Sequence, residues 1–198
     1  MDLVKDFWRR FWWAIIGIVI AAVAVLFVLN YYQRLVTVSG YRVSPEAAKA
    51  VEYYQTGDLA KAEAQYKLVV KKHPRDWFSW NGLANVYRDE NMLQLAEGAY
   101  LKALAINPKF EQAYRNIFGL YYAWAATDPT QLAKAEPILL RGLQLMPKSQ
   151  NILEDIVNYY AKTGDQQKLQ QYRAMLEAIR SSQPKTQPNS NLGPQVYQ

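Results

Sequence analysis

The sequence predicts an all-α chain in which a single apolar helix precedes a stack of helical hairpins. Three observations lead to this fold class. Near the N-terminus 19 consecutive residues carry no charge, two prolines 34 residues apart each follow a stretch of helical periodicity, and small and apolar residues recur with the same period. With 198 residues, the chain is long enough for one domain of ordinary size and an additional segment.

Composition excludes several classes of chemistry. The chain has no Cys and one His, which leaves no disulfide scaffold, thiol nucleophile, thiolate zinc site or His-pair metal site. We therefore expect no cofactor and no metal. The net charge of +6 would suit nucleic acid, but residues 43–180 hold 17 basic against 15 acidic side chains. A nearly neutral globular part argues against a phosphate-binding face, so we expect no nucleic-acid partner.

The uncharged run Phe11–Leu29 predicts a transmembrane helix over residues 11–33, after a short basic flank over 1–10. Its 19 residues span about 28 Å as a helix, close to the roughly 30 Å hydrocarbon core of a bilayer. Amphipathic rings favour the two membrane interfaces. Aromatic side chains cluster at both ends of the run, namely Trp8, Trp12, Trp13, Tyr31 and Tyr32. A buried core helix and a signal peptide cleaved after residues 22–24 are the alternative interpretations.

Residues 77–110 carry a spaced motif that ends in proline. Small and apolar residues stand at positions 4, 7, 8, 11, 20, 24 and 27 of this unit, and Pro at position 32. They are Trp80, Leu83, Ala84, Tyr87, Ala96, Tyr100, Ala103 and Pro108. This pattern resembles W-x2-L-G-x2-Y…A-x3-F-x2-A…P of the tetratricopeptide repeat (TPR) family, with Ala84 in place of Gly and Tyr100 in place of Phe.

The same frame predicts four repeats. They cover residues 43–76, 77–110, 111–149 and 150–180. The third repeat has five extra residues, Ala125–Pro129, between its two helices, and the last has a polar second helix that suits a terminal cap. Residues 34–42 are expected to be a connector, and 181–198 a disordered tail.

The resemblance implies an α-solenoid, a right-handed superhelix of helix-turn-helix repeats. Small residues at positions 8, 20 and 27 would let the two helices of a hairpin approach closely, while larger residues fill the seam to the next hairpin. One hairpin cannot bury its apolar stripe alone, so several must stack.

In the TPR family the concave face is lined by positions 2, 5, 9, 12 and 13 of each first helix. The resemblance therefore implies a partner-binding surface made of Tyr54, Phe78, Asn81, Asn85, Arg88, Arg115, Tyr122 and Asn158. Gln112, Gly119, Ala161 and Lys162 share these positions. The chaperone-binding subclass uses Lys and Asn at positions 5 and 9 of its first repeat, where this chain has Ala47 and Val51, so a chaperone C-terminus is not the expected ligand.

Other polar residues do not form a catalytic constellation. Glu154 and Asp155 are adjacent on a helix, so their carboxylates point about 100° apart, and we expect both on a solvated surface. His73 precedes a proline at a helix end, where an imidazole can cap carbonyls. No catalytic residue and no small-molecule substrate is therefore predicted, and the chain is not expected to be an enzyme.

These observations predict a single-pass membrane protein that acts as an adaptor or scaffold. A partner protein or peptide would bind in the concave TPR groove, and residues 11–33 would contact the lipid bilayer. The layout resembles bacterial inner-membrane adaptors, with Lys5, Arg9 and Arg10 favouring a cytoplasmic N-terminus and a TPR domain outside the cytoplasm. A cytoplasmic TPR domain is the alternative. A constitutive structural or assembly subunit of a membrane complex is the alternative function, with Gly17, Ala21 and Ala24 as a helix-packing stripe.

Overall fold

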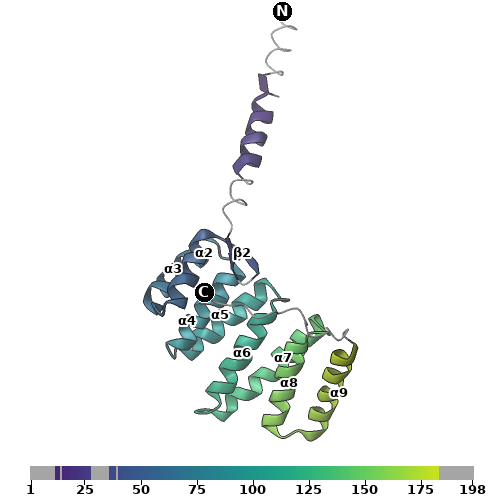
Figure 1. Cartoon of the computed structure of the whole chain (residues 1–198). Coiled ribbons are helices and arrows are strands. Elements are labelled where there is room, and N and C mark those ends of the chain that lie inside the picture. Colours follow the sequence, from purple (N-terminus) through teal and green to yellow (C-terminus); the bar gives the residue numbers. More distant parts are fainter. Residues whose placement is uncertain (1–11, 14, 28–35, 39, 183–198) are drawn as a thin grey trace, which may run out of the picture. The chain divides into compact units, whose positions relative to one another are not determined.

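A computed structural model describes residues 12, 13, 15–27, 36–38 and 40–182 of the chain (Figure 1). By its internal contacts the chain divides into two compact units, residues 1–74 and residues 75–198, and each is described by itself.

The first unit begins with an apolar helix. Residues 12, 13 and 15–27 are helical in the described part, and all their side chains are exposed except the half-buried Ile15. Among the described residues, no helix combines the length and the apolar character needed to cross a membrane. The segment 11–33 predicted as transmembrane lies partly outside the described residues, and the basic flank 1–10 lies wholly outside them.

A β-hairpin follows where the sequence predicted only a connector. Strands β1 (Val36–Val38) and β2 (Tyr41–Val43) pair antiparallel, with Val38 opposite Tyr41. The turn contains Gly40 at a φ of 81°, a left-handed conformation that glycine adopts without steric cost. β-Branched residues in both strands favour this short ladder.

Two helices complete the first unit. Helix α2 (Pro45–Gln55) begins at Ser44, whose Oγ accepts a hydrogen bond from the Ala47 backbone N–H at 3.1 Å. Helix α3 (Leu59–Lys72) begins at Asp58, which accepts from the backbone N–H of Lys61. Each cap satisfies a backbone donor that the first helical turn leaves without a partner.

Helix α3 ends at Lys72, and His73 stands at its C-cap position. The backbone N–H of His73 donates to the carbonyl of Val69 at 2.7 Å, and the residue is exposed. The peptide group already lies next to the last helical carbonyls and so reaches one directly.

The second unit is a series of antiparallel helix pairs with short turns (Figure 1). Its elements are α4 (Trp77–Asp89), α5 (Leu93–Ile106), α6 (Glu111–Trp124), the 3-10 helix η1 (Pro129–Lys134), α7 (Ala135–Leu145), α8 (Gln150–Thr163) and α9 (Gln166–Ser182). Pro108 and Pro147 each follow the end of a helix by two residues, as expected for a residue that cannot continue one.

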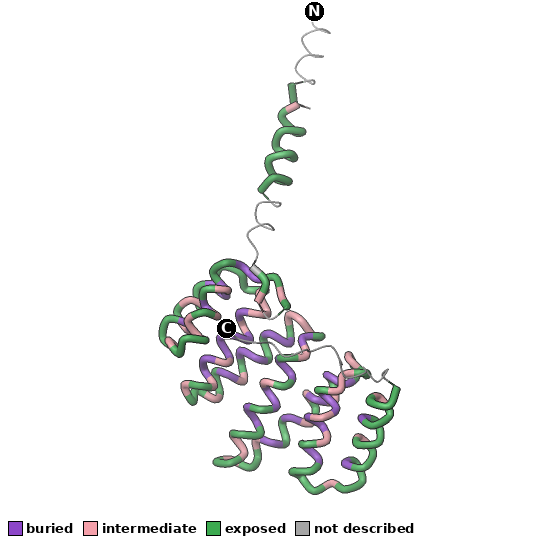
Figure 2. Tube along the Cα trace, in the orientation of Figure 1, coloured by how far each residue is buried: buried purple, intermediate pink, exposed green. Residues whose placement is uncertain are grey.

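Close packing within the second unit relies on small residues. Ala84, Ala96 and Ala103 are fully buried, and Figure 2 shows buried positions along the facing sides of the helices. Gly142 on α7 lies against α6, where a Cβ atom would stand 2.9 Å from Cδ1 of Tyr114. Only a residue without a side chain allows this approach.

The five extra residues of the third hairpin lengthen the turn between its helices. Helix α6 runs to Trp124, and η1 follows with Leu132 buried. Asp128 accepts a hydrogen bond from the Thr130 backbone N–H at 3.1 Å and so begins η1. The insertion thereby adds a short packed helix to the turn.

Most residues of the last helix, α9, are exposed (Figure 2), and most of its side chains are polar. Leu169 and Leu176, seven residues apart, are its buried residues and face α8. This stripe is narrower than those of the inner helices, as expected at the end of a stack. Residues 183–198, predicted as a disordered tail, lie outside the described residues.

A tyrosine–glutamate–lysine cluster links successive hairpins. The hydroxyl of Tyr121 donates to Oε1 of Glu97 at 2.9 Å, and Nζ of Lys134 lies 3.1 Å from the same oxygen. Burial raises the pKa of the Tyr121 hydroxyl, and the neighbouring carboxylate adds to that rise. The equivalent residues of the next pair repeat the cluster: Tyr160, Glu136 and Lys168.

Candidate functional site

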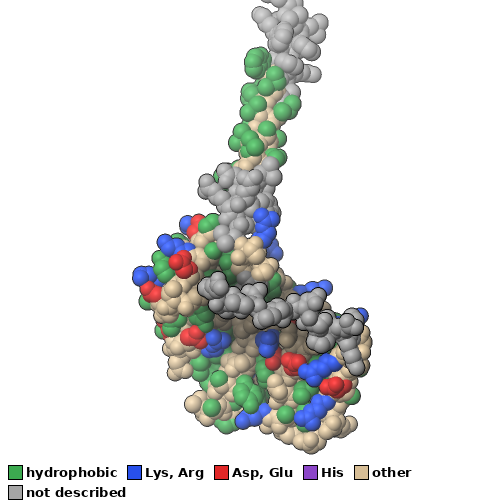
Figure 3. Space-filling model, in the orientation of Figure 1, with side chains coloured by type: hydrophobic (Ala, Val, Ile, Leu, Met, Phe, Trp, Pro, Cys, Tyr) green, Lys and Arg blue, Asp and Glu red, His purple; other side chains and the backbone are tan. Residues whose placement is uncertain are grey.

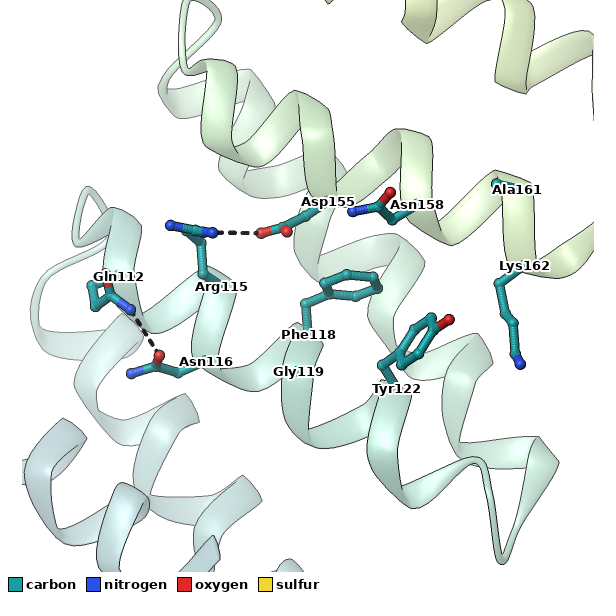
Figure 4. A pocket seen from close by; sticks show the side chains of 10 residues that line it. All are labelled: Gln112, Arg115, Asn116, Phe118, Gly119, Tyr122, Asp155, Asn158, Ala161 and Lys162. Atoms are coloured by element: carbon teal, nitrogen blue, oxygen red, sulfur yellow. Dashed lines mark hydrogen bonds and ion pairs between the residues drawn. The ribbon is translucent and has the colours of Figure 1, made fainter.

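The candidate site is a hollow of about 790 Å³ between helices α6 and α8 (Figure 4). Its volume lies in the range of ligand-binding clefts. Polar, charged and aromatic side chains from the two helices line it, together with two small residues. They are Gln112, Arg115, Asn116, Phe118, Gly119, Tyr122, Asp155, Asn158, Ala161 and Lys162.

Helical spacing explains why these residues face one another. Arg115, Gly119 and Tyr122 follow one another by four and three residues on α6, which places them on one face of the helix. Asp155 and Asn158 are three residues apart on α8 and form the opposite wall. The hollow is therefore a property of two first helices from successive hairpins.

A buried acid and a partly exposed base meet in this hollow. Nε of Arg115 lies 3.7 Å from Oδ2 of Asp155, too far for a hydrogen bond. Asp155 is only 7% exposed, and its Oδ2 has no hydrogen-bond partner among the described residues. Burial raises the pKa of the Asp155 carboxyl to about 6, although Arg115 acts in the opposite direction.

Aromatic side chains form the apolar part of the hollow. The rings of Phe118 and Tyr122 lie 5.8 Å apart between centroids in an edge-to-face arrangement. Phe118 is buried and Tyr122 is 44% exposed. Nζ of Lys162 lies 5.5 Å from the centroid of the Tyr122 ring, which places a cation at this end of the hollow.

A network of amides closes the neighbouring interface, between α4 and α6. Nδ2 of Asn116 donates to Oδ1 of Asn81 at 3.0 Å and to Oδ1 of Asn85 at 3.2 Å. The hydroxyl of Tyr100 also donates to Asn85, and Gln112 donates to Oδ1 of Asn116. Here the polar side chains bind one another across the two helices.

The structure brings three of the predicted partner-binding residues together in the hollow. They are Arg115, Tyr122 and Asn158. Gln112, Gly119, Ala161 and Lys162, which share the predicted concave positions, line it as well.

Five other predicted residues lie elsewhere. Asn81 and Asn85 belong to the amide network, and Nη2 of Arg88 lies 2.9 Å from Oδ1 of Asp89. Phe78 is half-buried and packs edge-to-face on Trp77. Tyr54 is half-buried on α2 and belongs to the first unit.

Sequence reasoning missed Asn116, Phe118 and Asp155 as lining residues. The expectation that Asp155 lies on a solvated surface is wrong, since it is buried against α6, whereas Glu154 pairs with Arg180 at 2.8 Å. The repeat frame held a signal for this, because Asn116 and Asp155 both occupy position 6 of their repeats. A polar residue at the same position of two successive repeats indicates a shared contact with the preceding helix.

Comparison with solved structures shows the TPR fold. The structure titled "MamA RS-1 ArsTM double mutant" is similar with a TM-score of 0.59 at 16% identity, over 71% of this chain and 76% of that one. A thermophilic TPR protein of Thermus thermophilus gives 0.55 at 17% identity, over 69% and 73%. The first TPR of Spaghetti (RPAP3), bound to the HSP90 peptide SRMEEVD, gives 0.52 at 18% identity, over 60% and 90%.

Sequence comparisons give no further assignment. No family model matches the chain, and no curated protein matches it. The likeness to solved structures, at these identities, concerns the fold.

Proposed function

We propose that this chain is a membrane-tethered adaptor that binds an extended segment of a partner protein in the hollow between α6 and α8. The observation that carries the proposal is the side chain of Asp155, which lines an open hollow beside the partly exposed Arg115 and whose buried Oδ2 has no hydrogen-bond partner among the described residues. The chain acts by binding and positioning its partner, because the side chains that line the hollow suit recognition and include no nucleophile next to a base.

The lining of the hollow supports a peptide as the ligand. Gln112 and Asn158 offer carboxamides to a backbone, and the rings of Phe118 and Tyr122 suit an apolar side chain. The RPAP3 neighbour bound to a peptide also supports this kind of ligand. Ala47 and Val51 stand where a chaperone clamp would need Lys and Asn, so the proposed partner is of another kind.

Site-directed photocrosslinking tests the groove. A photoreactive phenylalanine analogue in place of Tyr122 should capture the partner in cells, because the side chain at this position lines the hollow. The matched control is the same analogue in place of Leu101 on α5, since the two side chains are 44% and 42% exposed and Leu101 lies outside the hollow. Equal capture from both sites, or capture from Leu101 alone, would contradict the proposal.

The N-terminal helix supports the membrane tether. Its described residues are apolar on every side, and Figure 3 shows hydrophobic side chains covering this part of the helix. Ile18 is 69% exposed and Phe27 78% exposed. Water does not stabilise a helix that is apolar all round, so this segment needs a cover, and a lipid bilayer provides one.

Charge insertion tests the tether. The double substitution Val19→Arg/Val23→Arg should move the full chain from the alkali-resistant membrane fraction to the soluble one, since each Arg costs roughly 2.5–3.5 kcal/mol at the centre of a membrane helix. Leu101→Arg is the control and should stay in the membrane fraction. Protease added to bacterial spheroplasts should digest the helical hairpins if they lie outside the cytoplasm, while protection would place them inside.

A constitutive subunit of a membrane complex is the second candidate function. The helical backbone of residues 15–27 places Gly17, Ala21 and Ala24 on one face, and a Cβ at Gly17 would meet nothing within 4 Å. Such a small-residue face favours lateral packing against another membrane helix. Purification in mild detergent separates the two functions, because a subunit should keep its partners in fixed ratio at high salt and an adaptor should not.

A further inference from the structure

The chemistry of the ligand follows from comparing two interfaces of the second unit, on the premise of the proposed function. Position 6 of the third repeat is Asn116, and it contacts positions 5 and 9 of the preceding repeat, Asn81 and Asn85. Both hydrogen bonds join side chains of this chain. The α4–α6 interface is therefore satisfied by the chain itself.

The next interface lacks one of these contacts. Position 6 of the fourth repeat is Asp155, and position 5 of the preceding repeat is Arg115, 3.7 Å away. Position 9 is Gly119, which has no side chain to offer, and a Cβ there would meet nothing within 4 Å. The hollow opens beside Gly119, at the position that Asn85 occupies in the first interface, and the side chain of Asp155 lines it.

The side chains that surround the hollow indicate which chemical group of a ligand fits there. The Asp155 carboxylate can accept a hydrogen bond from a donor in the hollow, and the guanidinium of Arg115, whose side chain is 44% exposed, can donate to an acceptor there. A cationic donor would be repelled by Arg115 and Lys162, and an anionic acceptor would be repelled by Asp155. A neutral group with a donor and an acceptor side by side satisfies both. A carboxamide is such a group, and its flat shape suits the aromatic wall of Phe118 and Tyr122.

We propose that the hollow over Gly119 binds the carboxamide of an Asn or Gln side chain from the partner polypeptide. Its NH2 group donates to the carboxylate of Asp155, and its oxygen accepts from the guanidinium of Arg115. The partner thus supplies the amide that Asn85 supplies within the chain at the α4–α6 interface. The volume of about 790 Å³ leaves room for the backbone that carries the side chain.

Three capped amino acids, of which the glutamine and glutamate derivatives are isosteric, test this assignment without knowledge of the partner. N-acetylglutamine methylamide, N-acetylglutamate methylamide and N-acetyllysine methylamide are titrated into the full chain in detergent micelles, and the backbone amide signal of Gly119 is followed by NMR. The glutamine probe should bind about tenfold more tightly than either charged probe, the discrimination expected when one hydrogen bond to a charged group is lost. Equal binding of the three, or tighter binding of a charged probe, would overturn the proposal.

Variants at Gly119 distinguish the effect of filling the hollow from an effect on folding. Gly119→Asn places a carboxamide at position 9, as in the closed interface, and should abolish binding of the glutamine probe while the chain stays helical. Gly119→Ala is the matched control, because a methyl group leaves the hollow open, and it should bind the probe as the unchanged chain does. Undiminished binding to a helical Gly119→Asn variant would overturn the proposal.

Two further outcomes identify the occupant. Binding of the probe that tightens more than tenfold when residues 183–198 are removed would assign the hollow to this chain's own amide-rich C-terminal segment and overturn the assignment to a partner. If Tyr122 still crosslinks to a partner while the three probes bind equally, the proposed function stands and only the carboxamide assignment is overturned. If the probes are discriminated but Tyr122 gives no crosslink, the carboxamide assignment stands and the proposed function is contradicted.

Discussion

The interface between α4 and α6 and the interface between α6 and α8 use the same positions of the helical frame and differ in what those positions carry. Asn116 reaches two carbonyl oxygens in the first, whereas Asp155 in the second faces a guanidinium and a glycine. In the first interface the side chains are hydrogen-bonded to one another, and the second holds a hollow of about 790 Å³. The same helical positions are thus paired within the chain at one interface and line a hollow at the next, and the side chains that they carry decide between the two outcomes.

Two glycines, one on α6 and one packed against it, differ in the space around them. Gly142 on α7 admits the ring of Tyr114, so the absence of a Cβ is needed for packing. Gly119 on α6 has open space around it, so packing does not require a glycine there. A glycine that costs helix stability and relieves no crowding is more readily explained by a binding role.

Substitution of the two glycines should have opposite effects, and Gly142→Val should show the largest. Its side chain would stand within 3.1 Å of Tyr114 and Ile152, which are 1% and 0% exposed, and the Tyr114 hydroxyl is tied to the Pro108 carbonyl at 2.9 Å. We expect a loss of about 3 kcal/mol in the free energy of unfolding. Gly119→Ala should instead add about 0.5–1 kcal/mol. Urea unfolding measures both, and a neutral Gly142→Val would refute the close approach.

The buried Asp155 should make stability depend on pH. Its pKa lies at about 6 in the folded chain and at 3.8 in the unfolded one, so the folded state binds the proton more tightly between these values. The free energy of unfolding should therefore fall as the pH rises from 4 to 7, by on the order of 2 kcal/mol from this group.

The variant Asp155→Asn isolates this contribution. It should remove that part of the pH dependence, while Asp128 and Glu136, whose pKa values are lowered by hydrogen bonds, keep their opposite effect. Thermal unfolding across this pH range compares the two chains. Parallel curves would show that Asp155 titrates as it does in the unfolded chain.

Truncation at position 6 should affect the two interfaces unequally. Asn116→Ala leaves the carbonyl oxygen of the buried Asn81 without its donor and should cost about 1.5 kcal/mol. Asp155→Ala removes an oxygen that already lacks a hydrogen-bond partner and should cost less than half of that. Chemical denaturation at pH 7 measures the difference, and equal losses would mean that both interfaces are equally satisfied.

The clusters that link the hairpins should contribute the smallest effect. Tyr121→Phe removes the hydroxyl that donates to Glu97 and should cost about 1 kcal/mol, and Tyr160→Phe should do the same through Glu136. Tyr122→Phe is the control, because its exposed ring belongs to the hollow, and should stay within about 0.5 kcal/mol of the unchanged chain. Similar changes for all three variants would show that the clusters do not contribute to the free energy of unfolding.

Part of the candidate site could be predicted from the sequence. The resemblance to the TPR family predicts Arg115, Tyr122 and Asn158 on the concave face, and they line the hollow. The same resemblance predicts Asn81 and Asn85 there, yet their oxygens accept hydrogen bonds from Asn116. Spacing along one helix states which residues face the same way, but it does not state which of them reach a neighbouring helix.

The sequence by itself determined the helical-hairpin fold, because a period of 34 residues with small residues at fixed positions leaves few other ways to bury the apolar stripe. It also determined the uncharged apolar run near the N-terminus, a property that belongs to composition. The tertiary structure alone decided that Asp155 is buried, that Gly119 leaves space and that Gly142 does not. These properties depend on distances between side chains of different helices, which packing sets and which no local pattern encodes.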